Sequence, residues 1–333
     1  MNNNKLKLTK KEKTIYFGET ICQATFKTTN KQCTNKAYYK QNNQYLCGVH
    51  SNNRDRTTLP INPNKAINKL KEIEKQIEIL KEVAKENRDN DLQGDIILSK
   101  MRMMQDVEYI NGYMCIFPNF KHQNRQDGFG CAELSPKSIG PIEHGMPNLP
   151  SAKNLENYHQ FSKFWDFEFD DNNKLRAKYL EKRKEGYLDE TPHRHKYDRK
   201  TLKKYNKNIN IPKCSIYYDK YGKEHRYNYL ECRYFYCHFY ELLAPQEPDF
   251  KKLQKYIKRG FNLNIVGYDA YPVDHKDKKS MVKDLWICYN DTSKPFGHEL
   301  VLYTLLRIKK SANYPWNKYY KKNKEIYKNV IPQ

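Results

Sequence analysis

Residues Asn154–Phe164 read NLENYHQFSKF and predict an amphipathic helix, which we expect to begin at a Ser151 cap and to run to about Trp165. Helical geometry places Glu156, Gln160 and Lys163 on one polar face, at positions i, i+4 and i+7. The opposite, apolar side holds Leu155, Tyr158, Phe161 and Trp165. Periodicity alone indicates that the polar face is solvated.

The same stretch resembles the E-x-Y-x-Q-x-x-K-F helix of the NADAR family, whose members are N-glycosidases that handle ADP-ribose-like and riboflavin-precursor nucleosides. The residues at the five positions of that pattern are Glu156, Tyr158, Gln160, Lys163 and Phe164. Upstream, Leu134-Ser135-Pro136 stands where the family has an L-S-N loop, and Leu149-Pro150-Ser151 where it has a short turn into the helix. The resemblance implies an α+β, NADAR-like domain in which Ser135 and Tyr158 bind the substrate.

Cleavage of an N-glycosidic bond builds positive charge on the ring carbon of the sugar, as in other glycoside hydrolyses. A carboxylate near that carbon stabilises the charge and can orient or deprotonate water. The resemblance implies that Glu156 is this carboxylate, that Gln160 fixes a hydroxyl group, and that Lys163 binds a phosphate or orients the carboxylate. These three residues are therefore candidate catalytic residues.

The later part of the chain follows the family pattern less closely, because the acidic and W-G signature of the family is not evident. Asp269 comes just after a predicted strand at 263–268, where open sheets place ligand-binding groups. It is a candidate second catalytic carboxylate, and the alternative is a turn or capping residue. Gly297 and His298 begin a predicted helix and could bind a substrate phosphate through free N–H groups, the alternative being a plain helix start.

Near the N-terminus, Cys22, Cys33, Cys47 and His50 have the spacing C-x10-C-x13-C-x2-H. Zinc prefers four tetrahedral sulfur or nitrogen ligands, and the closing C-x2-H pair places two of them on one turn. The intervening residues are too polar to fold by apolar burial, so the segment needs a metal ion to hold it. It also resembles small treble-clef-like knuckles. We expect a structural Zn²⁺ site, and the alternative is a chance grouping.

The 333-residue chain has 61 Lys+Arg against 39 Asp+Glu, and its formal net charge of +22 favours polyanionic partners, nucleic acid first. The segment 173–223 is strongly basic and has interleaved tyrosines that could stack on bases. The alternative is a solubilising insertion. Candidate nucleic-acid contacts are Arg194, Lys196, Arg199, Lys200, Lys203 and Lys204.

The sequence also predicts the compartment. No apolar run is long enough to cross a membrane, and the N-terminus has no apolar signal core, so we expect no membrane partner. Nine cysteines without export indicate a reducing, intracellular location. The whole chain is similar to proteins of large eukaryotic DNA viruses that have no assigned activity, which implies the host cytoplasm or nucleus, or a virion.

We therefore expect a disordered basic tail (1–18), a zinc knuckle (19–52), a linker with an amphipathic helix (53–100), an α+β NADAR-like domain (101–312) with a basic insertion (173–223), and a basic tail (313–333). The helix at 63–87 begins at Asn62-Pro63 and either packs on its own domain or forms a dimer. The expected function is hydrolysis of an N-riboside, such as an ADP-ribosylated base or nucleotide, in association with nucleic acid. The alternative is a non-catalytic, zinc-containing nucleic-acid-binding protein.

Overall fold

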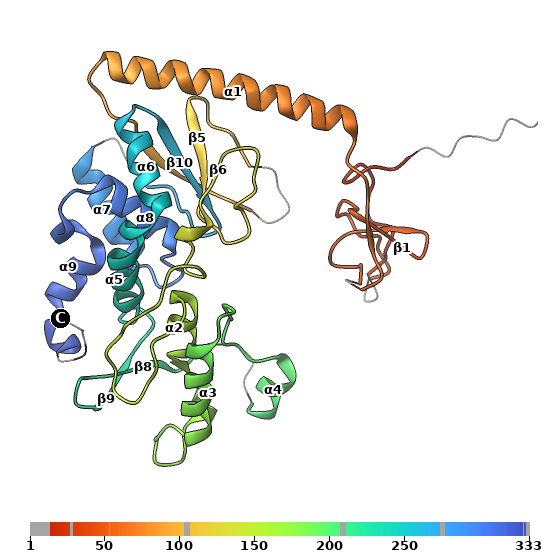
Figure 1. The fold of residues 1–333 in the computed structure, drawn as a ribbon. Coiled ribbons are helices and arrows are strands. Elements are labelled where there is room, and N and C mark those ends of the chain that lie inside the picture. Colours follow the sequence, from red (N-terminus) through yellow and green to blue (C-terminus); the bar gives the residue numbers. More distant parts are fainter. Residues whose placement is uncertain are drawn as a thin grey trace, which may run out of the picture. The chain divides into compact units, whose positions relative to one another are not determined.

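A computed structural model of the chain describes residues 14–26, 29–52, 54–102, 107–206, 211–273, 277–328 and 330. The chain divides into two units, Met1–Ile77 and Glu78–Gln333 (Figure 1). Most of the predicted disordered tail, residues 1–13, lies outside the described residues. Within the described residues, no helix combines the length and the apolar composition needed to cross a bilayer.

The first unit contains a small antiparallel sheet with the order β2-β1-β3, made of β1 (Tyr39–Gln41), β2 (Gln44–Leu46) and β3 (Thr57–Thr58). Asn42 and Asn43 join β1 to β2 with positive φ angles of 50° and 60°, the backbone that a two-residue hairpin needs and that asparagine tolerates well. Three cysteines and Leu46 form the buried cluster of this unit. So small a core needs further support, which the candidate metal ligands described below can provide.

Helix α1 (Pro63–Asp89) begins where the sequence predicts. The side-chain oxygen of Asn62 accepts a hydrogen bond from the Asn64 N–H (3.0 Å), and proline occupies the first helical position. Ile67, Leu70 and Ile77 are exposed, whereas Ala84 is fully buried. The dimer through this helix stays a prediction.

The second unit is built around a parallel sheet with the order β4-β10-β5-β6 (Figure 1). Its strands are β4 (Ile96–Lys100), β5 (Tyr113–Phe117), β6 (Phe129–Gly130) and β10 (Asn262–Gly267). The run Leu263–Gly267, apolar except for Asn264, is buried throughout, as expected for a central parallel strand that is covered on both faces. The second unit therefore includes β4, although the sequence predicts that the α+β domain begins only at residue 101.

Helices cover one face of this sheet. Leu263 and Ile265 of β10, with Ile96 and Ile116 from the neighbouring strands, belong to the main core, to which α6 (Pro248–Lys258) and α8 (His298–Arg307) contribute. The other face carries a smaller cluster that includes Cys115. The carboxyl end of β10 thus lies close to the N-terminus of α8, because Gly267 touches the side chain of Glu299.

The basic segment 173–223 is part of this unit's core. It contains α3 (Ala177–Leu188), α4 (Arg199–Lys204) and β8 (Cys214–Tyr218), and β8 pairs antiparallel with both β7 (Lys163–Phe164) and β9 (Glu224–Tyr227). Tyr187, Ile216 and Tyr217 are almost completely buried. Helix α2 (Leu155–Phe161) packs against α3 and α5 (Arg233–Leu243).

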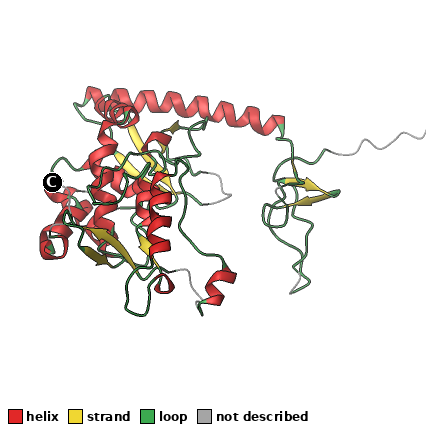
Figure 2. Cartoon of the chain, turned by 60° about the horizontal axis from the view of Figure 1, so that its bottom comes forward, coloured by secondary structure: helices red, strands yellow, loops and turns green. Residues whose placement is uncertain are grey.

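The C-terminal residues also pack into the second unit. Helices α7 (Lys278–Asn290) and α9 (Pro315–Lys322) contact each other. Trp316 is fully buried and its indole N–H donates to Glu241 Oε2 (2.6 Å), so much of the stretch expected to be a basic tail belongs to the core. Figure 2 shows helices, loops and short strands mixed through this unit. The chain is a mixed helix and sheet protein, as expected, while its NADAR-like identity stays a prediction.

Candidate functional site

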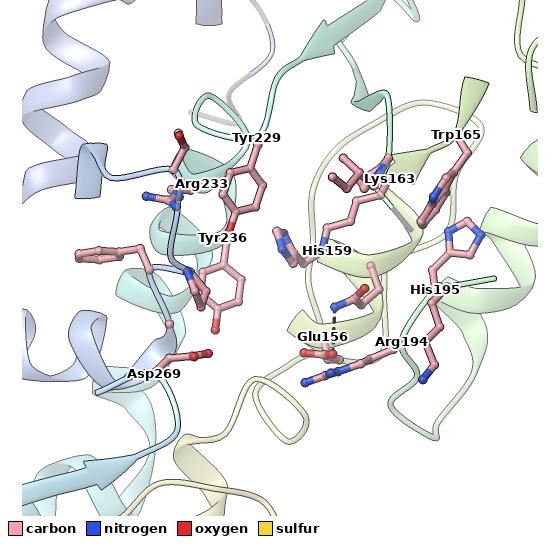
Figure 3. Close-up of a pocket in the computed structure, with 18 residues that line it drawn as sticks. Glu156, His159, Lys163, Trp165, Arg194, His195, Tyr229, Arg233, Tyr236 and Asp269 are labelled. Carbon is pink, nitrogen blue, oxygen red and sulfur yellow. Dashed lines mark hydrogen bonds between the residues drawn. The ribbon is translucent and has the colours of Figure 1, made fainter. Parts of the chain in front are cut away.

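The four residues predicted to be catalytic line one cavity of about 890 Å³ in the second unit (Figure 3). Glu156 and Gln160 come from α2, Lys163 from β7, and Asp269 from the segment after β10. Small-molecule sites usually have volumes of about 300–1,000 Å³, so the cavity is large enough for a nucleotide. Distant parts of the sequence therefore meet in one site.

Helix α2 is shorter than the sequence predicts, and this changes how Lys163 reaches the cavity. The helix begins after Asn154, whose side chain accepts from the Asn157 N–H (2.9 Å), and it ends at Phe161. Lys163 then pairs with Ser215 in the antiparallel sheet. Lys163 thus shares the cavity with Glu156 from a strand and not from the same helix face.

The charged groups on this side of the cavity lie close together. Gln160 Nε2 donates to Glu156 Oε1 (3.1 Å), which fixes the carboxylate. Burial lowers the pKa of the Lys163 ammonium group, as does the positive charge of Arg194, whereas Cys232 and Glu156 oppose this. Burial likewise holds the pKa of His159 well below its usual range, so the ring is neutral.

Asp269 lies across the cavity from Glu156. Figure 3 shows Asp269 and Tyr236 on one wall, and Glu156 with Arg194 on the other. Burial raises the pKa of the Asp269 carboxyl group, and the nearby carboxylate of Glu299 raises it further. The position of Asp269, two residues beyond the carboxyl end of β10, is where open sheets place ligand-binding groups.

The segment between α3 and α4 brings Arg194 and Lys196 to the cavity. The fully buried amide of Asn157, next to Glu156 on α2, donates to the carbonyls of Asp189 and Thr191 and accepts from the His193 N–H. At the C-terminal end of the segment, before α4, the Tyr197 hydroxyl donates to the buried carboxylate of Glu168. Two residues predicted to contact nucleic acid are therefore fixed beside the candidate catalytic groups. The remaining four predicted contacts, Arg199, Lys200, Lys203 and Lys204, are exposed on α4.

Three residues predicted to bind substrate do not line the cavity. Tyr158 is 2 % exposed and packs among core aromatic rings, including Tyr217 and Phe239. Ser135 is also buried, in the turn after a short 3-10 helix, where the Ser138 and Ile139 N–H groups donate to its carbonyl. His298 is buried behind Gly297, which does line the cavity.

Several lining residues were not predicted from the sequence, notably Trp165, Tyr229, Arg233 and Tyr236. Arg233 donates to the backbone carbonyls of Tyr289, Asp291 and Lys294, and so fixes the loop that leads to Pro295 and Gly297. Tyr229, Arg233 and Tyr236 stand in an aromatic run typical of a core, and no spacing in it marks a site.

The first unit contains a candidate metal centre made of Cys22, Cys33, Cys47 and His50, as predicted. The ligand atoms all lie within 4.8 Å of one another. His50 Nδ1 is 3.3 Å from Cys47 Sγ and 3.6 Å from Cys22 Sγ, and Cys33 Sγ is 4.0 Å from Cys47 Sγ. A tetrahedron with metal–sulfur distances of about 2.3 Å has edges of about 3.8 Å, so the group can hold one ion.

The protein environment of Cys47 favours the thiolate form that binds metals. Burial opposes ionisation, but hydrogen bonds from the backbone of His50 and Val49 and from the His50 ring outweigh it and lower the pKa of Cys47 to about 6. The three cysteines are almost completely buried, so an ion held here would have no open position for a substrate. The centre suits a structural role.

Comparison with family models, with characterised proteins and with solved structures finds no match to this chain. The chemistry of the cavity and of the cysteine cluster is therefore the basis for the function proposed below.

Proposed function

We propose that this chain is a hydrolase that cleaves the N-glycosidic bond of a phosphate-bearing N-riboside, such as an ADP-ribosylated base or nucleotide. One observation carries the proposal: Glu156 and Asp269, from separate elements, line the same cavity together with the cations Lys163, Arg194 and Lys196. Paired carboxyl groups suit acid and base chemistry at a sugar carbon, and cations suit the phosphate groups of a nucleotide. The resemblance of α2 to the NADAR helix supports the same reaction.

The two walls of the cavity suit different parts of such a substrate. Glu156, held by Gln160, can stabilise the positive charge that develops on the ribose ring carbon. Arg194 and Lys196 are exposed and can contact phosphate oxygens. Tyr229, which is exposed, offers aromatic surface for a base.

The test is a search for base release by the full-length, metal-loaded protein. ADP-ribosylated DNA, ADP-ribosylated nucleotides and the matching ribosides without phosphate would be incubated with the protein, and the products identified by mass. We expect release of a free base, with phosphate-bearing substrates preferred. If no substrate in this panel releases a base, the proposal is contradicted.

We infer that the ion held by the cysteine cluster is zinc, because three thiolates and one imidazole in a closed arrangement are the ligand set that structural zinc sites use. The polar residues between these ligands cannot form a core without a metal ion. Such an ion would stabilise the first unit and would take no part in the chemistry of the cavity.

A second function, binding of nucleic acid, is favoured by the net charge of +22 and by the four exposed cations of α4. We propose that it localises the hydrolase on its substrate. In the alternative in which the chain has no catalytic activity, binding is its whole function. Base release with retained binding supports the first interpretation, and binding without base release supports the second.

We expect DNA binding to become weaker, and less dependent on salt, when the four exposed cations of α4 are replaced by glutamine. These are Arg199, Lys200, Lys203 and Lys204. Each phosphate contact contributes about −0.9 to the slope of log K against log[salt] on duplex DNA, so four contacts account for up to about 3.6. The slope would be measured by fluorescence anisotropy. The control replaces four exposed lysines of α1, Lys71, Lys75, Lys81 and Lys85, which removes the same charge. Equal slopes for the two variants would contradict a contact surface on α4.

A further inference from the structure

Behind Asp269, at the start of α8, lies a buried acid that does not line the cavity. Glu299 is 1 % exposed, and its side chain fits between two glycines. A Cβ atom on Gly267 would stand 2.0 Å from Glu299 Oε1, and a Cβ atom on Gly297 would stand 2.8 Å from Glu299 Oε2. The space for this carboxylate exists because neither neighbour has a side chain.

The carboxyl groups of Glu299 and Asp269 are close enough for the charge of one to affect the ionisation of the other. The position that a Cβ on Gly297 would take is 2.8 Å from Glu299 Oε2 and 3.2 Å from Asp269 Oδ2, so the two oxygens are no more than 6.0 Å apart, the sum of those distances. Asp269 lines the cavity, whereas Glu299 is sealed behind Gly297. Two negative charges so close in a partly buried place oppose each other, so one of the two carboxyl groups is favoured in its protonated form.

The neighbouring histidine lies against the carboxylate of Glu299. His298 Nε2 is 3.1 Å from the carbonyl oxygen of Pro118, and since a carbonyl only accepts, this nitrogen carries a hydrogen. Nδ1 of the neutral ring is then a bare acceptor, yet it lies 3.1 Å from Glu299 Oε2. This contact is at ion-pair distance without hydrogen-bond geometry, because Glu299 Oε2 has no hydrogen-bond partner among the described residues. The charge of His298 lowers the pKa of Asp269, so it opposes the effect of Glu299.

The charged groups facing Asp269 come from several elements. Besides Glu299 and His298 of α8, Lys100 at the end of β4 and Arg194 of the α3–α4 segment favour its ionised form. Tyr236 of α5 lies on the same wall as Asp269, and Glu156 of α2 faces it across the cavity (Figure 3). Burial and Glu299 outweigh the cations, because the pKa of Asp269 is raised. Glu156, in contrast, lies beside the cations Lys163 and Arg194.

We propose that Asp269 is the proton donor of the cavity and that Glu299 and His298 are positioning residues that control its proton. This assignment rests on the proposed hydrolysis. As the bond between the sugar carbon and the base nitrogen breaks, its electron pair goes to the nitrogen, which takes the proton of Asp269. Water adds to the sugar carbon and gives a proton to Glu156. Exchange with solvent returns a proton to Asp269 and removes one from Glu156, so that one water is consumed in each cycle.

The test measures the protonation of Asp269 directly by carbon NMR of its carboxyl group, assigned by comparison with Asp269→Asn. Glu299→Gln removes a negative charge and is expected to move the midpoint of this titration to lower pH by on the order of 1 pH unit. His298→Gln removes a positive charge and is expected to move it to higher pH. Glu185→Gln, an exposed acid of α3, serves as the control and leaves the midpoint unchanged.

The alkaline limb of the pH–rate profile should follow the same midpoint, because activity requires protonated Asp269 and is lost as the pH rises through its pKa. A limb that does not follow the NMR midpoint would overturn the role of Asp269. If Glu299→Gln folds and its midpoint is unchanged, Glu299 does not control the proton of Asp269. If that variant does not fold, His298→Gln is the test, and a midpoint that does not move to higher pH would overturn the proposal. If the wild type releases no base, the proposed hydrolysis fails, but the midpoints still report whether the three residues are coupled.

Discussion

Replacing Glu156 by glutamine is expected to lower the rate of base release by about 10²–10³, which corresponds to about 2.7–4 kcal/mol of transition-state stabilisation. The substitution keeps the size of the side chain and removes its charge, and its amide oxygen can still accept from Gln160. Substrate in the ground state carries no positive charge on the ring carbon, so binding should be nearly unchanged. The rate would be measured by mass detection of the free base under single-turnover conditions, and binding by calorimetry.

Two controls separate a catalytic role of Glu156 from a structural one. Glu185→Gln makes the same chemical change at an exposed site on a neighbouring helix, and it should leave the rate unchanged. The thermal midpoint of Glu156→Gln should stay close to that of the wild type, because the side chain is half-buried in a polar cavity. A folded variant with the wild-type rate would show that Glu156 has no part in the reaction, and a variant that fails to fold would make it a structural residue.

Replacing Cys47 by serine is expected to remove the bound zinc, from about one ion per chain to a small fraction of that. The side chain is 2 % exposed and contacts both His50 and Cys33 in the cluster, so its loss leaves three ligands. Metal binding in such modules supplies most of their folding free energy, about 10–16 kcal/mol in zinc-finger peptides. The first unit should therefore unfold, which proteolysis would report as new cleavage sites within residues 14–62.

The second unit should keep its fold in this variant, because it has its own large core of aromatic and aliphatic side chains. Cys288→Ser is the matched control, since Cys288 lies on α7 and outside the cluster. Metal analysis by mass spectrometry decides the result. A wild-type protein with well under half a zinc ion per chain, or a Cys47→Ser variant that keeps its zinc, would contradict the metal site.

The elements that could be predicted are those with strong local signals. Asn62-Pro63 marks the start of α1, the strand predicted at 263–268 locates β10 to within one residue, and the helix start predicted at Gly297-His298 matches that of α8. The end of α2 could not be predicted. Lys163–Phe164 fit the helical pattern of the sequence, but they form a strand because they pair with Ser215 and Cys214, about fifty residues later in the chain. Only long-range contacts contain that information.

The residues 109–120 show the same limit. Within this stretch, Tyr113–Phe117 forms a strand. Gly112, with a φ angle of 76°, forms the turn before it, and Tyr109 instead packs against the sheet and donates its hydroxyl hydrogen to Asp127. The strand is fixed by its parallel partner β10, which comes much later in the chain.

The candidate site divides in a similar way. Glu156 and Asp269 could be predicted as candidate site residues because each is marked by the sequence around it. Glu156 lies in a motif that resembles a known helix, and Asp269 follows the end of a predicted strand. Glu299 could not, since its importance depends on the absence of side chains at Gly267 and Gly297, which are brought beside it only by folding. Tyr158 shows the opposite error, because a motif position that suggested contact with the substrate is filled by a core residue.

The two glycines around Glu299 also limit how this site can change over evolutionary time. A side chain at Gly267 would displace the Glu299 side chain, and a side chain at Gly297 would displace both Asp269 and Glu299. Exchange of the acid for a smaller residue would remove the closest contacts of a side chain at 267, whereas a Cβ atom at 297 would still stand 2.6 Å from Asp269 Cβ. Descendants of this gene that lose the glutamate should therefore accept side chains at position 267 more readily than at position 297, a pattern that sequencing of diverged copies would reveal.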